Sequence, residues 1–559
     1  MSGSGTETAL RPGAGAGAVP GAGATAWPGA AGGRFAARLG ALRGGRADLA
    51  AAGLGALSAA ALPPVFALPV LLIAVPGLLV LIAATPGPLV AARRGFWFGF
   101  GNNLLGLYWI TEAILVEAAR FWWLVPLAVP ALAAVMGAFT AGAAALARPA
   151  RGGWTLVVAL AGAWVLADLA RQFAFTGFPW NLWGADWAFP GRLGDVFLQP
   201  AALVGVHGLT LATMLLAGTP LLSWRWRVAG GVLLAAWAGF GLVRLAAPLP
   251  SPLAPPLAAG PGITAVLVQG DVAEGQKWNR GLARDLFARY LALTRAGVAR
   301  APAGRPTLTI WPETASPFLL GSEPAVRQAI AAAAGGGPGT ASAGRTVALV
   351  GAVRFGGHRR PRNSLFALTG GGQVVGIYDK FHLVPFGEYQ PDWFPLPIQV
   401  VPGGGFAPGP GPRTLALPGL PPVGPLICYE AIFPGQIVQP GARPGLLVNV
   451  TNDAWFGNSA GPRQHFAAAR MRAVEEGLPL LRAANTGISA VIDARGVVVA
   501  RLGLDRAGSV VAPIPGALPA TPFARFGLIL PFGMALGCMA AGILAARGRS
   551  GTAKPGRSP

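Results

Sequence analysis

The stretch Pro425-Leu-Ile-Cys-Tyr-Glu-Ala431 is an apolar run that ends at a cysteine and continues into polar residues. It predicts a buried strand that leads into a tight turn and then a helix, which is the arrangement of a nucleophile elbow. Such a turn places a reactive side chain beside backbone N–H groups, so Cys428 is a candidate nucleophile. The alternative is a buried structural cysteine, the commonest fate of a free cysteine. The neighbours Tyr429 and Glu430 favour the catalytic interpretation over simple core packing.

A carboxylate follows another predicted strand, in Leu308-Thr-Ile-Trp-Pro-Glu-Thr314. Pro312 is expected to end this strand, because proline has no N–H to donate to a sheet. Glu313 would then project beyond the sheet edge, where the sites of layered α/β domains form. Taken alone, the segment is explained at least as well by a solvated carboxylate in a loop.

A third segment, Tyr378-Asp-Lys-Phe-His-Leu-Val-Pro-Phe-Gly-Glu-Tyr389, is polar and aromatic. Its Lys380 is one of only three lysines in a chain whose basic residues are otherwise arginines. A lysine offers a compact point charge that the planar guanidinium group of arginine does not, which makes Lys380 a candidate functional residue. The alternative is a surface loop with a local ion pair to Glu388. His382 by itself is more typical of a structural histidine.

The three segments together suggest one mechanism. A thiol with an ordinary pKa of about 8.5 must lose its proton to become a nucleophile. Glu313 is a candidate acceptor of that proton, and partial burial is expected to raise its pKa towards the working range. Lys380 and the backbone N–H of Tyr429 would stabilise the oxyanion of a tetrahedral intermediate. No histidine is placed in the sequence as an obvious base beside Cys428.

The composition indicates a membrane protein. The chain is 53% hydrophobic and 11% charged, with a mean hydropathy of +0.54, whereas soluble proteins carry about 25% charged residues. Several apolar stretches approach the length of about 20 residues that a helix needs to cross a bilayer. We expect eight spans at 46–63, 67–86, 95–116, 122–147, 153–170, 199–222, 228–246 and 526–546. Cys538 lies in the last one as a bystander, and the two cysteines lack the spacing of a disulfide framework or a metal site.

The arginines indicate an orientation. Alternate short loops carry the pairs Arg93 and Arg94, Arg148 and Arg151, and Arg225 and Arg227. Cytoplasmic loops carry the excess of basic residues, so the net charge of +22 is interpreted as a topology signal and not as a nucleic-acid site. We expect 1–45 to be a disordered cytoplasmic tail, 46–246 a seven-span membrane domain and 547–559 a second cytoplasmic tail. The region 261–515 would then lie on the opposite side of the membrane.

The region 261–515 has a different character from the rest. Short β-rich runs such as Ile263–Val268 and Leu446–Val450 alternate with helical stretches such as Ala467–Glu476. This alternation is typical of a soluble layered α/β domain. The stretch 246–262 is rich in proline and glycine and is expected to be the linker into it.

The residues Glu313 in WPE, Lys380 in DKFHLVPFGE and Cys428 in CYE, in that order, resemble the Glu-Lys-Cys triad of the nitrilase (carbon–nitrogen hydrolase) superfamily. Further matching stretches are Thr176–Trp180, Val268–Asp271, Lys277–Trp278, Thr451–Gly457, Gln464–Glu475 and Thr521–Arg525. From about residue 46 to 546 the chain resembles the membrane-embedded branch of the superfamily, the apolipoprotein N-acyltransferase family.

The resemblance implies a fold and an activity. The fold would be a multi-pass membrane domain of about eight helices in the inner (cytoplasmic) membrane, with a periplasmic αββα nitrilase-like domain. The activity would move an acyl chain from the sn-1 position of a phospholipid to Cys428, as a thioester. A second step would deliver it to the α-amine of the diacylglyceryl-cysteine of a lipoprotein. Glu388 and Glu430 match supporting acids of the family, and Trp278 matches a substrate-facing aromatic residue on a mobile arm. No metal or nucleotide cofactor is implied.

Two alternatives remain open from the sequence. One is a membrane-anchored nitrilase-type amidase that acts on a small soluble amide. A single span would be enough to anchor such an enzyme, so seven spans before the catalytic region argue against it. The other is a transporter or binding protein with an inactive α/β domain, and the intact triad argues against that.

Overall fold

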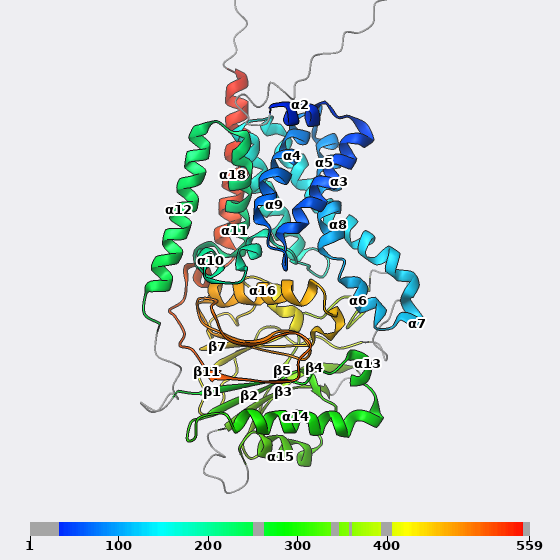
Figure 1. Ribbon diagram of the computed structural model, residues 1–559, viewed down its shortest axis with the longest axis vertical. Coiled ribbons are helices and arrows are strands. Elements are labelled where there is room, and N and C mark those ends of the chain that lie inside the picture. Colours follow the sequence, from blue (N-terminus) through cyan, green and yellow to red (C-terminus); the bar gives the residue numbers. More distant parts are fainter. Residues whose placement is uncertain (1–32, 250–261, 337–345, 357–359, 393–404, 552–559) are drawn as a thin grey trace, which may run out of the picture.

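A bundle of helices stands on a layered α/β domain in the computed structural model (Figure 1). The structure describes residues 33–249, 262–336, 346–356, 360–392 and 405–551. The bundle contains the N-terminal helices together with α18, which returns from the far end of the chain. The α/β domain is therefore inserted between the penultimate and last long helices of the bundle. The predicted fold class, a helical membrane domain plus a nitrilase-like α/β domain, is confirmed.

Eight helices of the bundle overlap the predicted apolar stretches. They are α3 (Gly44–Ser58), α4 (Leu71–Ala83), α5 (Pro88–Gly106), α8 (Val125–Ala147), α9 (Trp154–Phe173), α11 (Ala201–Gly218), α12 (Trp224–Ala246) and α18 (Ile529–Gly551). Within the described part of the chain, five helical segments are long and apolar enough to cross a membrane: Ala118–Ala150, Trp154–Phe173, Ala201–Leu221, Trp224–Ala246 and Ile529–Gly548. A sixth, Leu68–Ala83, is apolar but shorter. The count of eight crossings stays a prediction.

Short helices connect the long ones. They are α6 (Ile110–Leu115), α7 (Ala118–Phe121), α10 (Arg192–Phe197) and α17 (Pro522–Phe526), with the 3-10 segment η5 (Trp183–Ala188). A further helix, α2 (Gly33–Ala41), precedes the bundle. The expected disordered tail at 1–45 is therefore wrong for residues 33–45, and residues 1–32 lie outside the described residues. The expected C-terminal tail at 547–559 begins inside α18, and residues 552–559 lie outside the described part.

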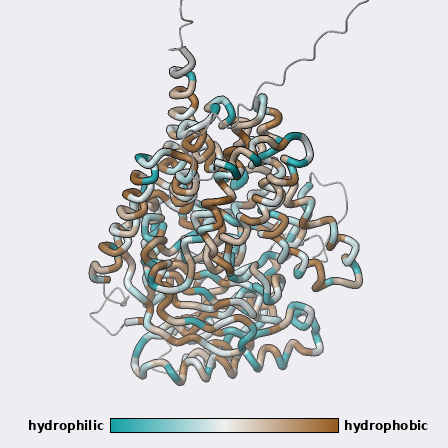
Figure 2. Tube along the Cα trace, turned by 45° about the horizontal axis from the view of Figure 1, so that its top comes forward, coloured by the Kyte–Doolittle hydropathy of each residue, from teal (hydrophilic) through white to brown (hydrophobic). Residues whose placement is uncertain are grey.

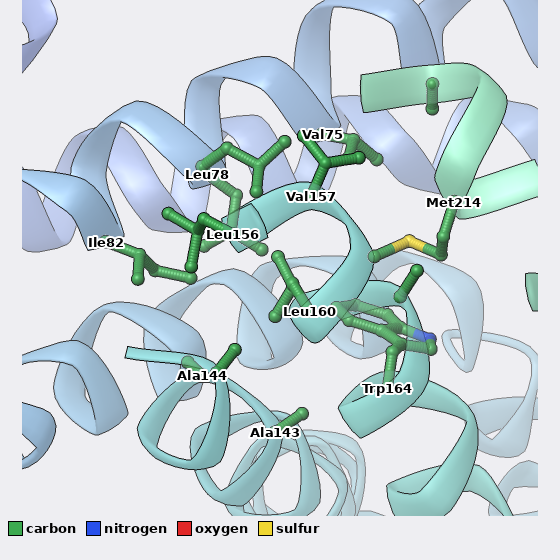
Figure 3. Packing of buried hydrophobic residues seen from close by; sticks show 14 of the residues in the cluster. Val75, Leu78, Ile82, Ala143, Ala144, Leu156, Val157, Leu160, Trp164 and Met214 are labelled. Atoms are coloured by element: carbon green, nitrogen blue, oxygen red, sulfur yellow. The ribbon is translucent and has the colours of Figure 1, made fainter. Parts of the chain in front are cut away.

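The bundle is held together by apolar and small side chains. Hydrophobic residues predominate along its helices (Figure 2). Leu78 of α4, Leu156 and Trp164 of α9, and Met214 of α11 meet in its core (Figure 3). A Cβ atom added at Gly95 of α5 would lie 2.5 Å from the backbone oxygen of Thr140 in α8. Such small residues let membrane helices approach closely, where packing replaces the hydrophobic effect as the driving force.

The α/β domain consists of two sheets between layers of helices. The six-stranded sheet has the order β11-β1-β2-β3-β4-β5 and the five-stranded sheet the order β10-β9-β8-β7-β6. The strands of the first are β1 (Thr264–Gln269), β2 (Thr307–Ser316), β3 (Thr346–Phe355), β4 (Pro361–Thr369), β5 (Val374–Asp379) and β11 (Gly508–Pro513). Those of the second are β6 (Val423–Ile427), β7 (Leu446–Thr451), β8 (Leu480–Ala484), β9 (Ser489–Ile492) and β10 (Val498–Leu502).

Helices cover both outer faces of this sandwich. The helices α14 (Ala283–Val298) and α15 (Pro324–Ala333) lie outside the six-stranded sheet, and α16 (Gly461–Glu476) lies between the five-stranded sheet and the membrane helices (Figure 1). The short helix α13 (Glu274–Lys277) follows β1. The core between the sheets is apolar and includes Leu267, Ile310, Val448 and Leu481, all fully buried. The result is an αββα sandwich whose α16 face contacts the bundle.

The structure differs from the sequence prediction at Pro312. Strand β2 does not end there but continues to Ser316, and only its register with β3 shifts between Trp311 and Ser316. The irregularity accommodates the missing proline N–H without ending the strand. On β3, a Cβ atom at Gly351 would lie 2.1 Å from the backbone oxygen of Pro312. Glycine at this position therefore permits the close approach, and Glu313 is placed on an ordered strand instead of a loop.

Candidate active site

Cys428 lies at the turn that follows strand β6. It is the first residue of the 3-10 helix η8 (Cys428–Ile432), so the predicted strand and turn are present. Its backbone φ of 51° falls in the left-handed region, which residues other than glycine rarely adopt. Strained backbone of this kind clusters at functional sites. The side chain is buried, with 6% of its surface exposed.

Glu313 and Lys380 come together near this turn as a buried ion pair. The Nζ atom of Lys380 donates to Oε1 of Glu313 over 3.0 Å and lies 2.8 Å from Oε2 of Glu388. The Lys380 side chain is only 1% exposed. An ammonium group removed from water in this way must be paired, and the two carboxylates provide its pairing.

Three further residues, which the sequence did not single out as catalytic, contact this pair. The Nδ2 atom of Asn363 donates to both carboxylates, over 2.7 Å to Glu313 and 2.9 Å to Glu388. The backbone N–H of Asn452 donates to the other oxygen of Glu313 over 2.9 Å. Lys277 donates to the backbone oxygen of Glu313 over 3.0 Å. The rarity of lysine in the chain and the matching stretch Lys277–Trp278 were the sequence signals that pointed to Lys277.

The electrostatics of the site follow from burial and from these neighbours. Burial acts to lower the pKa of Lys380, but Glu313 and Glu388 outweigh it and hold that pKa well above its ordinary value. Burial acts to raise the pKa of Glu313, but Lys380 and Lys277 hold it below its ordinary value. The expected rise in the Glu313 pKa is therefore wrong, because the two ammonium groups outweigh burial. Burial and then the charge of Glu313 raise the pKa of the Cys428 thiol, so the thiol is protonated at rest.

The side chain of Glu430 stabilises the turn at Cys428 by hydrogen bonds. One of its oxygens accepts from the N–H of Ile427 over 2.7 Å and from the hydroxyl of Tyr378 over 2.8 Å. The other accepts from the N–H of Phe381 over 2.7 Å. Burial raises the pKa of Glu430 to about 7, although these donors act to lower it. The carboxyl group thus ties the turn at Cys428 to the segment on both sides of Lys380.

Comparison with known proteins gives the family. The family model described as the apolipoprotein N-acyltransferase N-terminal domain matches residues 54–219, and the carbon-nitrogen hydrolase model matches residues 283–521. Apolipoprotein N-acyltransferase from Rhizobium meliloti is 40% identical over 446 residues, which cover 77% of this chain and 80% of that protein. The one from Rhodopseudomonas palustris is 38% identical over 496 residues, 84% of this chain and 89% of that protein. The chain belongs to the apolipoprotein N-acyltransferase family.

As a member of this family the protein is an acyltransferase and a membrane protein, and the amidase alternative is less supported. Some solved structures are similar over about half of the chain. An amidase from Nesterenkonia sp. matches with a TM-score of 0.33 and 17% identity, over 46% of this chain and 92% of that chain. A carbon-nitrogen hydrolase from Helicobacter pylori matches with a TM-score of 0.33 and 18% identity, over 45% and 88%.

Tyr429 and Trp278, the two aromatic candidates, differ in burial and in hydrogen-bond partners. The hydroxyl of Tyr429 donates to the backbone oxygen of Gly177, in the loop after α9, over 2.7 Å. Trp278 is 58% exposed, and its Nε1 atom donates to Glu274 over 2.8 Å. The other oxygen of Glu274 accepts from the side chain of Asn452 over 2.5 Å. This apolipoprotein N-acyltransferase family member therefore links an exposed tryptophan to the buried Glu313 through two intervening residues.

A buried polar contact joins the catalytic domain to the bundle. The Oε1 atom of Gln464, on α16, accepts from Nε1 of Trp109 over 2.9 Å and from Nε1 of Trp180 over 2.8 Å. Its Nε2 atom donates to the backbone oxygen of Gly106 over 3.1 Å. The Nε2 atom also donates to the backbone oxygen of Pro63 over 3.4 Å, so that both acceptor and both donor positions of this amide are used between the two domains, which fixes α16 against the helices of this acyltransferase.

His382, which the sequence suggested to be structural, packs against an aromatic ring. Its ring stacks on that of Phe433 with centroids 3.9 Å apart and an angle of 3° between the planes. Burial lowers its pKa to about 4, so the ring is neutral at neutral pH. The structural interpretation of His382 stays the better one.

Proposed function

We propose that this acyltransferase moves an acyl chain from a membrane phospholipid to the N-terminal amine of a lipoprotein, through a thioester on Cys428. The proposal is carried by one observation: a strained, buried cysteine lies beside a carboxylate and an ammonium group that form a buried ion pair. That combination supplies a nucleophile, a base and an oxyanion partner. Apolar helices beside the site would give access to lipid.

In the first half-reaction, the sulfur of Cys428 attacks the sn-1 ester carbonyl carbon of the phospholipid while its proton passes to Glu313. Lys380 and the backbone N–H of Tyr429 stabilise the oxyanion that forms. The intermediate then collapses with loss of the C–O bond, and Glu313 returns the proton to the departing lyso-phospholipid oxygen. Because the thiol is protonated at rest, proton transfer must accompany attack, which explains a carboxylate held ionised beside it.

In the second half-reaction, the α-amine of a diacylglyceryl-cysteine attacks the thioester carbon. A proton of the amine passes to Glu313, the C–S bond breaks, and the thiolate of Cys428 takes the proton back. The product is an amide. Glu388 fixes Lys380, Glu430 fixes the turn, and the exposed Trp278 contacts a substrate.

We also propose an inner-membrane location with eight crossings and a periplasmic catalytic domain. The start of α12 and the end of α18 lie at the end of the bundle away from the α/β domain (Figure 1). Arg225 and Arg547 fall at these positions, and an excess of basic residues is typical of the cytoplasmic side. The catalytic domain would then face the periplasm.

The deciding experiment separates the two half-reactions. Enzyme mixed with phospholipid alone should gain one acyl mass on Cys428 and release lyso-phospholipid, and neutral hydroxylamine should remove the adduct. Addition of an acceptor peptide should then discharge it. Cys428→Ser should lose nearly all turnover, whereas Cys538→Ser should behave like the wild type. Transfer at full rate without an acyl adduct would overturn the thioester route in favour of direct attack by the amine.

A further inference from the structure

The carbonyl oxygen of Cys428 has a partner of its own, which the proposed chemistry does not use. Nε2 of His465, on α16, lies 3.0 Å from that oxygen. Because 37 residues separate the two in the chain, no local sequence pattern places this histidine near the nucleophile. Its ring is fully buried.

The surroundings of His465 determine which ring nitrogen carries a proton. A carbonyl oxygen can only accept, so Nε2 must hold a proton to bond with it. Nδ1 lies 3.0 Å from Oδ1 of Asp453 and 3.2 Å from Nη2 of Arg482. It either donates to the carboxylate or accepts from the guanidinium group. In both cases the N–H at Nε2 faces Cys428.

The other partners of this group hold it still. Arg482 donates to the second oxygen of Asp453 over 2.8 Å, and Thr451 donates to the first over 2.9 Å. The side chains of His465, Asp453 and Arg482 are all completely buried. On the membrane side, the ring of Trp180 lies 5.6 Å from that of His465. The imidazole of His465 is therefore held in place by hydrogen bonds on the side of the sheet and by ring packing on the side of the bundle.

A fixed carbonyl oxygen has a geometric consequence. The peptide unit between Cys428 and Tyr429 is trans and planar, so its C=O and N–H groups point in opposite directions. A bond that fixes the Cys428 oxygen therefore also fixes the direction of the Tyr429 N–H. That N–H is the group which, in the proposed function, donates to the oxyanion.

We propose that His465 is a positioning residue for acyl transfer: its Nε2–H holds the Cys428–Tyr429 peptide plane so that the Tyr429 N–H is aimed at the oxyanion. The inference rests on the proposed roles of Cys428 and Tyr429. It implies that His465 acts on steps that pass through an oxyanion and not on the reactivity of the thiol itself. The bond also helps the turn to keep the strained φ of Cys428.

Two substitutions distinguish the contributions of the two ring nitrogens of His465. His465→Asn places an amide near the position of Nδ1 and removes the donor to Cys428, whereas His465→Gln places an amide N–H near the position of Nε2. Both are made in a Cys538→Ser background, so that alkylation by iodoacetamide reports on Cys428 alone. Alkylation displaces iodide at a saturated carbon and forms no oxyanion, unlike acylation by phospholipid.

We expect His465→Asn to slow both acylation by phospholipid and discharge to an acceptor peptide by about 10-fold or more, since loss of a whole oxyanion donor costs about 10²–10³-fold. The rate of Cys428 alkylation should be unchanged, and His465→Gln should recover most of the acyl-transfer rate. Equal slowing of alkylation and acylation, or a Gln variant as slow as the Asn variant, would overturn the proposal.

As a control, the thermal unfolding transition of each detergent-solubilised variant shows whether it is folded. If His465→Asn does not fold, the acyl-transfer rate of His465→Gln alone tests the proposal. Acyl transfer near the wild-type rate supports the positioning role, and a loss of 10-fold or more refutes it. Failure of the thioester itself is seen separately, as the absence of an acyl adduct on the wild-type enzyme.

Discussion

The Nζ atom of Lys380 lies 3.0 Å from Oε1 of Glu313, although 67 residues separate the two in the chain. Strands β2 and β5 belong to the same sheet, and β3 and β4 lie between them. The ion pair therefore joins β2 to the residue that follows β5, across the two intervening strands. Asn363 of β4 donates to the carboxylate of Glu313. Any change that alters the shape or the charge of this buried pair should affect catalysis.

Lys380→Arg keeps the positive charge but should lose most activity. The planar guanidinium group is larger than an ammonium group, and the site leaves 1% of the lysine side chain exposed. Loss of an oxyanion donor predicts a fall in kcat of about 10²-fold or more. Acyl transfer to a diacylglyceryl peptide measures it. Lys554→Arg, the same change near the C-terminus, is the control, and near-normal turnover in Lys380→Arg would exclude an oxyanion role.

Asn363→Asp should shift the acid limb of the pH–rate profile to higher pH. The amide of Asn363 helps to hold the pKa of Glu313 below its ordinary value, and an aspartate would replace that donor with a negative charge. The pKa of Glu313 must then rise, and because the base is active only when ionised, activity is lost at a higher pH than in the wild type.

The measurement for Asn363→Asp is kcat/KM as a function of pH. Asn458→Asp is a matched control, since Asn458 is exposed and bonds Asp505 away from the catalytic residues. An acid limb at the wild-type position, with only a uniform loss of rate, would mean that Glu313 is not the base.

Gln464→Leu should weaken the contact between the two domains. The change leaves the buried indole N–H groups of Trp109 and Trp180 without their acceptor, and a buried polar group that loses its partner costs about 1–3 kcal/mol. The midpoint of thermal unfolding in detergent should fall. Gln328→Leu, at an exposed position on α15, is the control. An unchanged midpoint would show that the amide contributes nothing to the interface.

A reporter of membrane topology tests the proposed orientation. A reporter fused after about residue 260 should be active in the periplasm, and one fused to either terminus should be active in the cytoplasm. The expectation follows from the alternation of arginine-rich loops and the proposed eight crossings. Both termini on the periplasmic side would contradict the eight-span arrangement.

Several features of the fold follow from local patterns. The length and apolar character of the stretches predict helices that pack in lipid, and the β-rich runs predict the sheets, because both depend on residues close together in the chain. The same holds for the turn at Cys428, where an apolar run meets polar residues. Two local predictions fail: β2 passes through Pro312, and α2 occupies residues expected to be disordered. In the first case pairing in a sheet outweighs the loss of a single N–H donor.

The sequence by itself singled out the residues that we propose to carry the chemistry, since Glu313, Lys380 and Cys428 stand out by residue type and by the motifs around them. Only the tertiary structure decided their surroundings. The pKa of Glu313 is lowered and not raised, because strand pairing brings Lys380 to its carboxyl group and the position of α13 brings Lys277 to its backbone oxygen. The contact of His465 with the oxygen of Cys428 depends likewise on how α16 packs. Electrostatic and hydrogen-bonding energies depend on distances between atoms, and for residues far apart in the chain those distances are set by packing and not by sequence spacing.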